Sequence, residues 1–465
     1  MCTSVCTSVC AIARASRLGN SRSVHVLLLA YYFPPDGGPG CQRPLSFARH
    51  LASLGVRCTV VTRAIATHRG LFDPEDATLL EDLKAEVRVV RAQPCENWPE
   101  LHAALITTAC NAIAEERPDV ILPTMSPFEL WPIANQLSRQ HDLPTICDLR
   151  DPWALDGVQD YRSIWHWWRD WRAMRSMLRR ASGIIANTAE SRTAILAAAP
   201  ELNPARITHI TNGWERDSFA DTGTIVRPGI KLRLVHGGNF LCSELYARDR
   251  MLRRCLGWLR HRPEPIQASG RTPLHLLRVI RRLREAGEPA GNEVQLRVIG
   301  QDDPALHRCV QESGVADAVE LCGYRCHHDL VHELQHADAL FLTLHGLPNS
   351  RRARIVPGKT YEYLAAGRPI LAGLPEGDAR DLVATSPRAF LSKPCDEQVL
   401  AEQLVSLHQQ WRDGAFDHAA VPPGLDAYER RHLTEQLRDF VAHILRQSSG
   451  TACSRTTQVS PLVHG

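Results

Sequence analysis

Short runs of apolar residues alternate with amphipathic segments along most of the chain. An apolar run over Val24–Tyr31 is followed by the loop FPPDGGPG, by a helical pattern from about Arg43 to Leu54, and by a second apolar run over Val56–Thr62. Strand, loop, helix and strand in this order predict a βαβ unit of a parallel sheet.

The same alternation recurs in both halves of the chain. In the first half we expect further buried strands at Val120–Leu122, Thr145–Cys147, Gly183–Asn187 and Ile207–Ile210. The pattern restarts at Leu232–His236, and later strands are expected at Gln295–Ile299, Val319–Leu321, Ala339–Leu342 and Pro369–Leu371. The chain is therefore predicted to be α/β, with two doubly wound domains.

The restart of the pattern places the junction of the two domains near residue 225. We expect an N-terminal domain over 24–225 and a C-terminal domain over 226–430, with an insertion at 242–269. A helix at 431–447, centred on about Leu433–Leu445, is expected to cross back to the first domain. Residues 1–23, which repeat CTSVCTSVC, and 448–465 read as unstructured. In such sheets ligands bind at the carboxyl ends of the strands, so two facing domains predict one cleft.

Charge and cysteine content exclude several classes of protein. The 465 residues carry a net charge of only +3, which argues against a nucleic-acid binder. Fifteen scattered cysteines indicate a reducing compartment, hence a cytoplasmic protein, and no cofactor and no metal site is expected. Cys322 and Cys326 precede His327 and His328 without a second ligand pair. No apolar run is long enough for a membrane span.

Two segments are candidates for anion binding. In PGKTYE, Pro357-Gly358 marks a helix start and places Lys359 beside free N–H groups, where a bound diphosphate would offset an unfavourable cation, and Glu362 follows one turn later. The alternative is a solvated Lys–Glu pair. The glycines of FPPDGGPG suit either close approach of a ligand or a tight turn.

Several motifs, taken in order, resemble one family. The motifs are YYFPPDGGPGCQRP, DLRDPW, ASGIIANTAES, ITNGWERDSF, HGGNF, GRTP and PGKTYEYLAAGRPIL. Over about residues 24–445 the chain resembles a GT-B glycosyltransferase of the family 4 type, which retains the anomeric configuration. The resemblance implies two Rossmann-like domains and transfer of a sugar from a nucleoside-diphosphate sugar to a hydroxyl acceptor, in polysaccharide or glycolipid assembly.

The same resemblance implies roles for individual residues. Lys359 and Arg271 would neutralise the leaving diphosphate without a metal, and Glu362 would hold the donor ribose. Arg150 and Asp151 would face the cleft near the transferred sugar. The remaining donor-side candidates are Gly37, Gly38, Gly40, Asn212, Gly238, Asn239 and Gly358.

The chain departs from the family pattern in three places. Arg354 stands where the wider family has its first glutamate, the stretch 124–131 lacks a histidine that many relatives carry, and about 28 extra residues separate HGGNF from GRTP, which would displace Arg271. These departures leave a non-catalytic sugar-nucleotide-binding or scaffold homologue as the alternative. A GT-B epimerase is a second alternative, for which the sequence shows no clear acidic pair.

Two arginine-rich segments are candidate surfaces. Residues 164–180 form an amphipathic pattern with Ile164, Trp167, Trp168, Trp171, Met174 and Leu178 on one face, which suits either a membrane interface or a protein core. Residues 248–286 carry 11 arginines and three acids, which suits either phosphate or lipid headgroups or a solvated face. Peripheral contact with the inner face of the membrane is one hypothesis.

Overall fold

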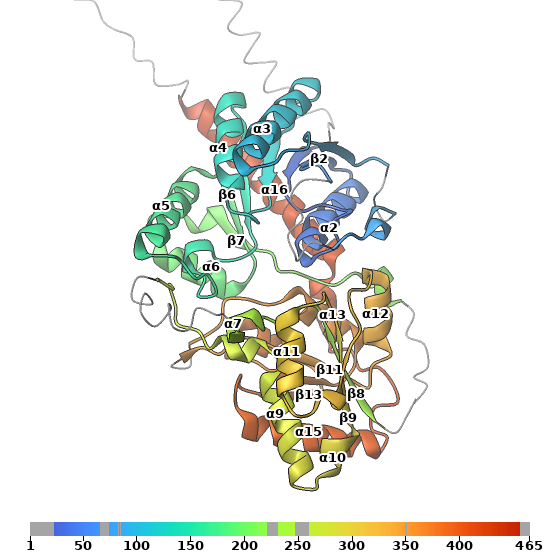
Figure 1. Ribbon diagram of the computed structural model, residues 1–465. Helices are drawn as coiled ribbons and strands as arrows, with labels where there is room; N and C mark the ends of the chain where they lie inside the picture. The colour runs from blue at the N-terminus through green and yellow to red at the C-terminus, as the bar shows by residue number, and fades with distance from the viewer. Residues whose placement is uncertain are drawn as a thin grey trace, which may run out of the picture.

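The computed structural model describes residues 23–65, 74–81, 83, 85–220, 231–246, 260–348 and 351–455. Two α/β domains lie one above the other, with the first half of the chain in one and most of the second half in the other (Figure 1). The predicted segment 1–23 lies, except for Ser23, outside the described residues, and so do 456–465.

The N-terminal domain is built on parallel strands in two adjoining sheets. Its order is β3-β2-β1-β4, and parallel bridges from Ile121 to Thr145 and from Thr124 to Asp148 continue it into β5-β6-β7. The strands are β1 His25–Leu29, β2 Arg57–Thr62, β3 Arg88–Arg91, β4 Val120–Pro123, β5 Ile146–Leu149, β6 Gly183–Ala186 and β7 Ile207–His209. Most are fully buried, as apolar strands covered on both faces should be.

The C-terminal domain has one parallel sheet in the order β10-β9-β8-β11-β12-β13. Its strands are β8 Leu232–Gly237, β9 Val294–Ile299, β10 Val319–Leu321, β11 Ala339–Thr343, β12 Ile370–Gly373 and β13 Ala389–Ser392. The strand order reverses between β8 and β11, which is where ligands bind in open α/β sheets. Both domains are thus doubly wound, as the sequence predicts.

Helices cover the sheets of both domains. They are α2 Pro39–Ser53, α3 Trp98–Glu115, α4 Leu130–His141, α5 Ile164–Arg180, α6 Ala189–Ala198, α7 Ser243–Tyr246, α9 Leu274–Glu285, α10 Pro289–Glu293, α11 Pro304–Glu312, α12 His327–Gln335, α13 Gly358–Ala366, α14 Asp378–Ala384, α15 Glu397–Arg412 and α16 Arg430–Arg455. Among the described helices, none combines the length and the apolarity needed to span a membrane.

Helix α16 returns from the C-terminal domain to the first domain. It packs on α2 and adds Leu433, Leu437, Val441 and Ile444 to the core of the N-terminal domain. The crossing helix is therefore present as predicted. The expectation of an unstructured tail from Ser448 is wrong for 448–455, because the helix backbone continues to Arg455. Extending an established helix requires little apolar pattern, since only nucleation is costly.

Several predicted limits and elements differ from the structure. Helix α2 begins at Pro39 and not near Arg43, because Gly38 is an extended N-cap and proline suits the first helical position. Strands β3 and β13 are absent from the prediction. Both alternate or only partly bury their side chains, so neither forms a continuous apolar run.

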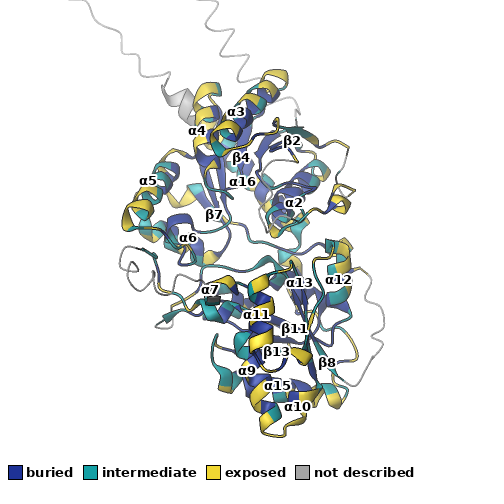
Figure 2. Ribbon diagram, viewed as in Figure 1, coloured by how far each residue is buried: buried dark blue, intermediate teal, exposed yellow. Residues whose placement is uncertain are grey.

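Helix α5 only partly matches its predicted burial. Met174 and Leu178 are buried, but Ile164 is 55% exposed and Trp168 is 43% exposed, so the predicted apolar face leaves the core at its first turns. Trp165, which is not among the residues of the predicted apolar face, is 72% exposed. The outer side of α5 is coloured as exposed in Figure 2.

The described end of the insertion forms a strap between the domains, defined here as residues 260–267. Its His261 exchanges two backbone hydrogen bonds with Tyr161 of the N-terminal domain, at 2.9 and 3.0 Å. Its Gln267 does the same with Gly346 of the C-terminal domain, at 2.8 and 3.0 Å. The insertion therefore joins the domains across one side of the cleft.

Candidate active site

The glycine loop between β1 and α2 reaches across to the second domain. The Tyr324 hydroxyl donates to the Gly37 carbonyl at 3.2 Å, and a Cβ on Gly37 would lie 2.3 Å from that hydroxyl oxygen. A Cβ on Gly40 would lie 2.8 Å from the ring of Tyr32. None of Gly37, Gly38 and Gly40 has a positive φ, so Gly37 and Gly40 serve close approach and not an unusual backbone conformation.

The Arg150 side chain fixes the position of this loop by hydrogen bonds. Its guanidinium donates to the carbonyls of Gly40 at 2.6 Å and Pro39 at 2.9 Å, and the Asn187 amide donates to the Arg150 carbonyl at 3.0 Å. Burial lowers the pKa of Arg150. Two donors of Arg150 are thus used within the protein, which gives it a positioning function toward the loop.

A buried ion pair ties α2 to the end of β5. The Arg43 guanidinium donates to both carboxylate oxygens of Asp148, at 2.7 to 3.1 Å, and also to the carbonyls of Ile210 and Thr211. Asp148 is fully buried. Asn212 follows in the connection between the domains, and Gly213 packs directly on the backbone of Tyr428.

Lys359 lies at the second position of α13, facing the loop after β8. Its Nζ is 3.1 Å from Nε2 of His236, and Nδ1 of His236 is 2.9 Å from the Phe341 carbonyl. Nδ1 must donate to that carbonyl, so Nε2 accepts from the lysine. Gly238 has φ +100° and a Cβ there would lie 2.9 Å from Nζ, so glycine is required by both conformation and space.

Two cations meet at this place. Burial, reinforced by the nearby Arg271, lowers the pKa of Lys359 to about 7. Arg271 ends the turn Ala268–Arg271, and burial lowers its pKa as well. Neither side chain forms an ion pair within the described part of the chain. The insertion therefore leaves Arg271 beside Lys359, and the two positive groups repel each other until an anion binds.

Glu362 lies one turn after Lys359 and is held by two partners. Nε2 of His327 is 2.9 Å from its carboxylate and the Arg430 guanidinium is 3.6 Å away. Although burial raises the pKa of Glu362, His327 and Arg430 lower it below the ordinary value. The backbone N–H of His327 donates to the Asp76 carboxylate at 3.0 Å, so His327 also links the C-terminal domain to the N-terminal domain.

An acidic pair from the N-terminal domain faces Arg271. Burial raises the pKa of Asp151, and burial followed by the neighbouring Asp151 raises the pKa of Asp156 to about 7. One oxygen of Asp156 accepts from the Val158 N–H at 2.9 Å. The charges of Arg271 and Arg354 act in the opposite direction on Asp156. Asp151 and Asp156 therefore form an acidic pair that the sequence does not reveal.

Arg354 is tied to the other domain and to the strap. Its guanidinium donates to the Leu155 carbonyl at 2.8 Å, and its carbonyl accepts from the Thr188 hydroxyl at 2.9 Å. Glu264 of the strap is buried, 3.2 Å from Arg351 and 3.8 Å from Arg354. The Glu264 carboxylate of the insertion thus faces Arg354, which stands where the family pattern has a glutamate.

The other sequence candidates surround this centre. Asn239 accepts from the Gln301 N–H at 2.9 Å, and a Cβ on Gly358 would meet nothing within 4 Å, so the start of α13 is open. His345 was not predicted. It is buried, and burial followed by the charge of Arg271 lowers its pKa to about 4, so it is neutral at neutral pH. Among the described residues no cluster of metal-ligating side chains forms.

Sequence reasoning missed the partners that come from distant segments. In the sequence His327 belongs only to the Cys322–His328 segment, which resembles a metal site, and Asp156 and His345 belong to no motif. The pairing of His327 with Glu362 comes from the packing of α12 on α13 within the C-terminal domain, and the raised pKa of Asp156 comes from burial and from the neighbouring Asp151. The nearest signal was their position, since Asp156 follows DLRDPW and His345 follows a buried strand.

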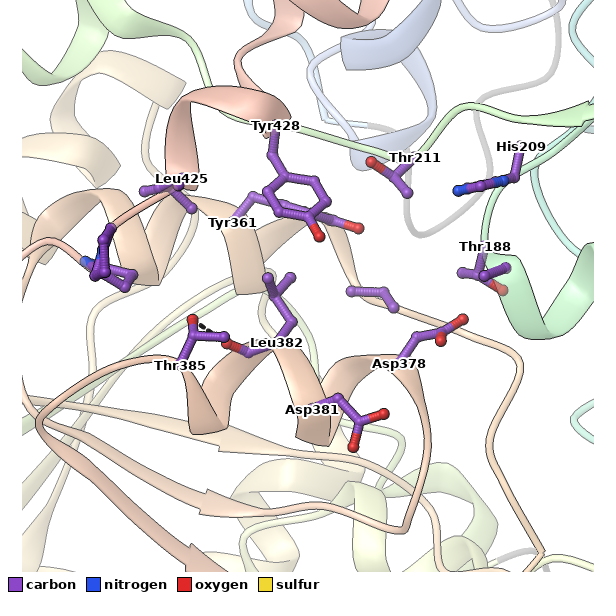
Figure 3. A pocket seen from close by; sticks show the side chains of 15 residues that line it. Thr188, His209, Thr211, Tyr361, Asp378, Asp381, Leu382, Thr385, Leu425 and Tyr428 are labelled. Carbon is purple, nitrogen blue, oxygen red and sulfur yellow. Dashed lines mark hydrogen bonds between the residues drawn. The ribbon is translucent and has the colours of Figure 1, made fainter.

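A cavity of about 410 Å³ lies between the domains beside the chain connections, away from Lys359 and Arg271. Thr188, His209 and Thr211 of the N-terminal domain line one side, and Asp378 and Asp381 of α14 line another (Figure 3). Tyr361 and Tyr428 also line the cavity, beside Thr211. None of the predicted site residues lines this cavity.

Two family models match the chain, one in each domain. The family model of the glycosyl transferase 4-like domain matches residues 40–213, and the model of glycosyl transferases group 1 matches residues 271–410. No curated protein sequence matches the chain.

Solved structures show the same fold. HepE of Anabaena in complex with UDP-glucose shares 18% identity and a TM-score of 0.54, with 92% of this chain and 99% of that chain covered. Sucrose-phosphate synthase of Thermosynechococcus elongatus shares 14% identity and a TM-score of 0.55, with 94% and 100% covered. WaaG, a glycosyltransferase involved in lipopolysaccharide biosynthesis, shares 14% identity and a TM-score of 0.53, with 91% and 98% covered.

Proposed function

We propose that this chain, which belongs to the GT-B glycosyltransferases of the family 4 type, moves a hexose from a nucleoside-diphosphate sugar to a hydroxyl acceptor and retains the anomeric configuration. The observation that carries the proposal is the meeting of Lys359 and Arg271 at the open start of α13, where neither forms a direct ion pair with a carboxylate among the described residues. Two half-buried cations beside a helix N-terminus match the two negative charges of a nucleoside diphosphate.

The chemistry follows from this charge. Breaking the bond between the sugar carbon and the diphosphate builds negative charge on the leaving phosphate, and Lys359 and Arg271 stabilise that charge. We infer that these protein cations act without a metal ion. Neutral His236 orients the lysine amine toward the site through the 3.1 Å contact.

The other side chains fit supporting functions. Glu362, oriented by His327, can accept hydrogen bonds from the hydroxyls of the donor ribose. Asp151 and Asp156 lie on the acceptor side and face Arg271, where a carboxylate can bind hydroxyls of the acceptor or the transferred sugar. Arg150 keeps the glycine loop in contact range of the diphosphate.

A panel of UDP-, GDP-, ADP- and dTDP-sugars tests the proposal. We expect wild-type protein to bind one donor and to turn it over, with an anomeric product of unchanged configuration by NMR, and Lys359→Ala to abolish turnover. Lys393→Ala, which changes an exposed lysine of the same domain, is the matched control and should behave as wild type. Donor binding with no turnover in any acceptor extract would favour the scaffold alternative, to which Arg354 points.

We also propose a place in polysaccharide or glycolipid assembly, in the cytoplasm at the inner face of a membrane. The similarity to WaaG supports the assembly of surface glycans. The exposed tip of α5 supports the membrane contact, because Ile164, Trp165 and Trp168 lie there beside Arg169 and Arg172, and the Arg172 guanidinium is 4.6 Å from the Trp168 ring.

The second arginine-rich segment is a weaker membrane candidate. Arg260 and Arg262 pair with Asp160, and Arg284 pairs with Asp317, so several of its described arginines already have partners.

Flotation with anionic liposomes at low salt tests the contact. Trp165→Ala with Trp168→Ala should reduce binding by about tenfold or more, since each large apolar side chain contributes about 1.5–3 kcal/mol when buried. Val421→Ser, which changes an exposed apolar residue elsewhere, is the control. Absence of wild-type binding at low salt would overturn the proposal.

A further inference from the structure

A nucleophilic cluster lies outside the candidate active site, in the loop between β13 and α15. Cys395 occupies this loop with φ +65°, a left-handed conformation that few non-glycine residues adopt. Such a conformation persists only where surrounding contacts hold it. The contacts come from the turn Ala268–Arg271 and from helix α9.

The contacts form a chain of polar side chains. Sγ of Cys395 is 3.6 Å from the Ser269 hydroxyl, which is 3.3 Å from Nε2 of His275. Nδ1 of His275 is 2.7 Å from the carboxylate of Glu397, which the Arg278 guanidinium also approaches at 3.2 Å. The carboxylate fixes the imidazole so that Nε2 faces the serine and the thiol. Thiol, imidazole and carboxylate in this order are the arrangement that activates a cysteine nucleophile.

The charges around the thiol favour its ionised form. Burial raises the pKa of Cys395, but hydrogen bonds from His275 and Ser269 outweigh burial and lower the pKa below the ordinary value. Of the other half-buried cysteines that the structure describes, Cys110, Cys322 and Cys326 all have a pKa raised by burial. Cys395 thus differs from cysteines of similar exposure in the same protein.

We propose that Cys395 is a site of covalent modification by low-molecular-weight disulfides, activated by the Ser269–His275–Glu397 cluster. In the reaction the Cys395 sulfur attacks one sulfur of the reagent, a new S–S bond forms, the S–S bond of the reagent breaks, and the second half leaves as a thiolate. The thiol proton passes to the cluster before the attack. No other oxidant is required, because the reagent itself is reduced.

The modified sulfur would disturb the turn that carries Arg271. Ser269 is two residues before Arg271, and a Cβ on the intervening Gly270 would lie 2.9 Å from the Cβ of Pro394 and 2.7 Å from the Leu344 carbonyl. The turn therefore rests on the Cys395 loop with no spare room. A substituent on the sulfur displaces Ser269 and with it Arg271. This consequence, unlike the modification itself, rests on the proposed function.

Peptide mapping by mass spectrometry measures the modification directly. Wild-type protein is treated with Ellman's reagent, an aromatic disulfide, at about pH 7, and rates are read at each cysteine. Cys395 should react about tenfold faster than Cys322 and Cys326. An equal or slower rate at Cys395 overturns the proposal.

Variants test whether the cluster, and not solvent exposure alone, accelerates the reaction of Cys395. Glu397→Gln should slow Cys395 toward the rate of Cys322, whereas Glu402→Gln, an exposed glutamate of the same helix, should leave it unchanged. His275→Ala should act in the same direction as Glu397→Gln. If Glu397→Gln folds as wild type by circular dichroism and Cys395 still reacts at the wild-type rate, the cluster does not activate the thiol.

A binding arm tests the coupling to Arg271. UDP, GDP, ADP and dTDP are titrated calorimetrically into treated and untreated wild type and into Cys395→Ser. Treatment should weaken nucleotide affinity at least fivefold in wild type and leave Cys395→Ser unchanged. Unchanged affinity after complete modification refutes the coupling. If untreated protein binds no nucleotide, the proposed function fails, while the modification rates still decide on Cys395.

Discussion

Replacing Lys359 by methionine is expected to stabilise the folded protein and to abolish nucleotide binding. Burial, reinforced by Arg271, lowers the pKa of Lys359 from 10.5 to about 7. At about 1.4 kcal/mol for each tenfold change in the proton equilibrium, this corresponds to an upper bound of about 5 kcal/mol that the charged lysine costs on folding. Because the side chain is partly exposed, we expect a gain of about 2 kcal/mol for the methionine variant.

The pH dependence of this gain has a definite sign. Below about pH 7 Lys359 is protonated in the folded and the unfolded protein, so the whole cost is present. Between about pH 7 and 10.5 the unfolded chain binds more protons than the folded one, so the stability of the wild type rises with pH relative to the variant. The gain from Lys359→Met should therefore be largest near pH 6 and shrink toward pH 9.

Urea denaturation near pH 6 and near pH 9 measures both effects. Lys393→Met, on an exposed lysine, is the control and should change little at either pH. Calorimetric titration with the nucleotides shows the loss of binding. The reasoning is refuted if Lys359→Met is no more stable than wild type near pH 6, or if its gain grows toward pH 9.

Three further predictions concern the neighbouring groups. Asp156→Asn should remove an ionisation near pH 7 from the pH profile of donor turnover. Because the pKa of Asp156 is raised in the folded protein, the stability of the wild type falls as the pH rises from about 4 to about 7, so the asparagine variant should be more stable than the wild type mainly above pH 7 in thermal melts. Gly37→Ala should weaken the contact between the domains and raise susceptibility to limited proteolysis, because its Cβ would lie 2.3 Å from the Tyr324 hydroxyl oxygen and 2.8 Å from the Cβ of Asp76; unchanged susceptibility would contradict this close approach. Asp148→Asn should cost about 3–5 kcal/mol in urea denaturation by leaving Arg43 buried and unpaired, and a loss below 1 kcal/mol would contradict the packing described.

The fold was largely accessible from the sequence because its strands are buried on both faces. Continuous apolar runs such as Val24–Tyr31 are found within two residues of the observed strands. The strand Arg88–Arg91 was missed because its side chains are exposed or half-buried, and the helix at Pro39 was placed late because its first turn is read as loop sequence. Local pattern reports burial, so elements with little burial leave little signal.

The site was accessible only in part. Lys359 stood out from its place in a helix start, and the structure places it beside Arg271, 88 positions away in the numbering. The partner of Glu362 was not predicted, because His327 reaches it through the packing of α12 on α13. The raised pKa of Asp156 likewise comes from its burial and from the nearby Asp151. Such groups carry no local pattern and emerge only from tertiary contacts.

Arg354 and the insertion, which the sequence presents as two separate departures from the family, form one feature in the structure. The strap brings the buried carboxylate of Glu264 to within 3.8 Å of Arg354, so an acid from the insertion stands opposite a cation at the position where relatives carry an acid. Without Glu264, the guanidinium of Arg354 would have no carboxylate within 4 Å in the described part of the chain. One carboxylate therefore remains on this side of the cleft, but it is carried by the insertion and not by position 354. The insertion and the substitution thus compensate each other within a working site.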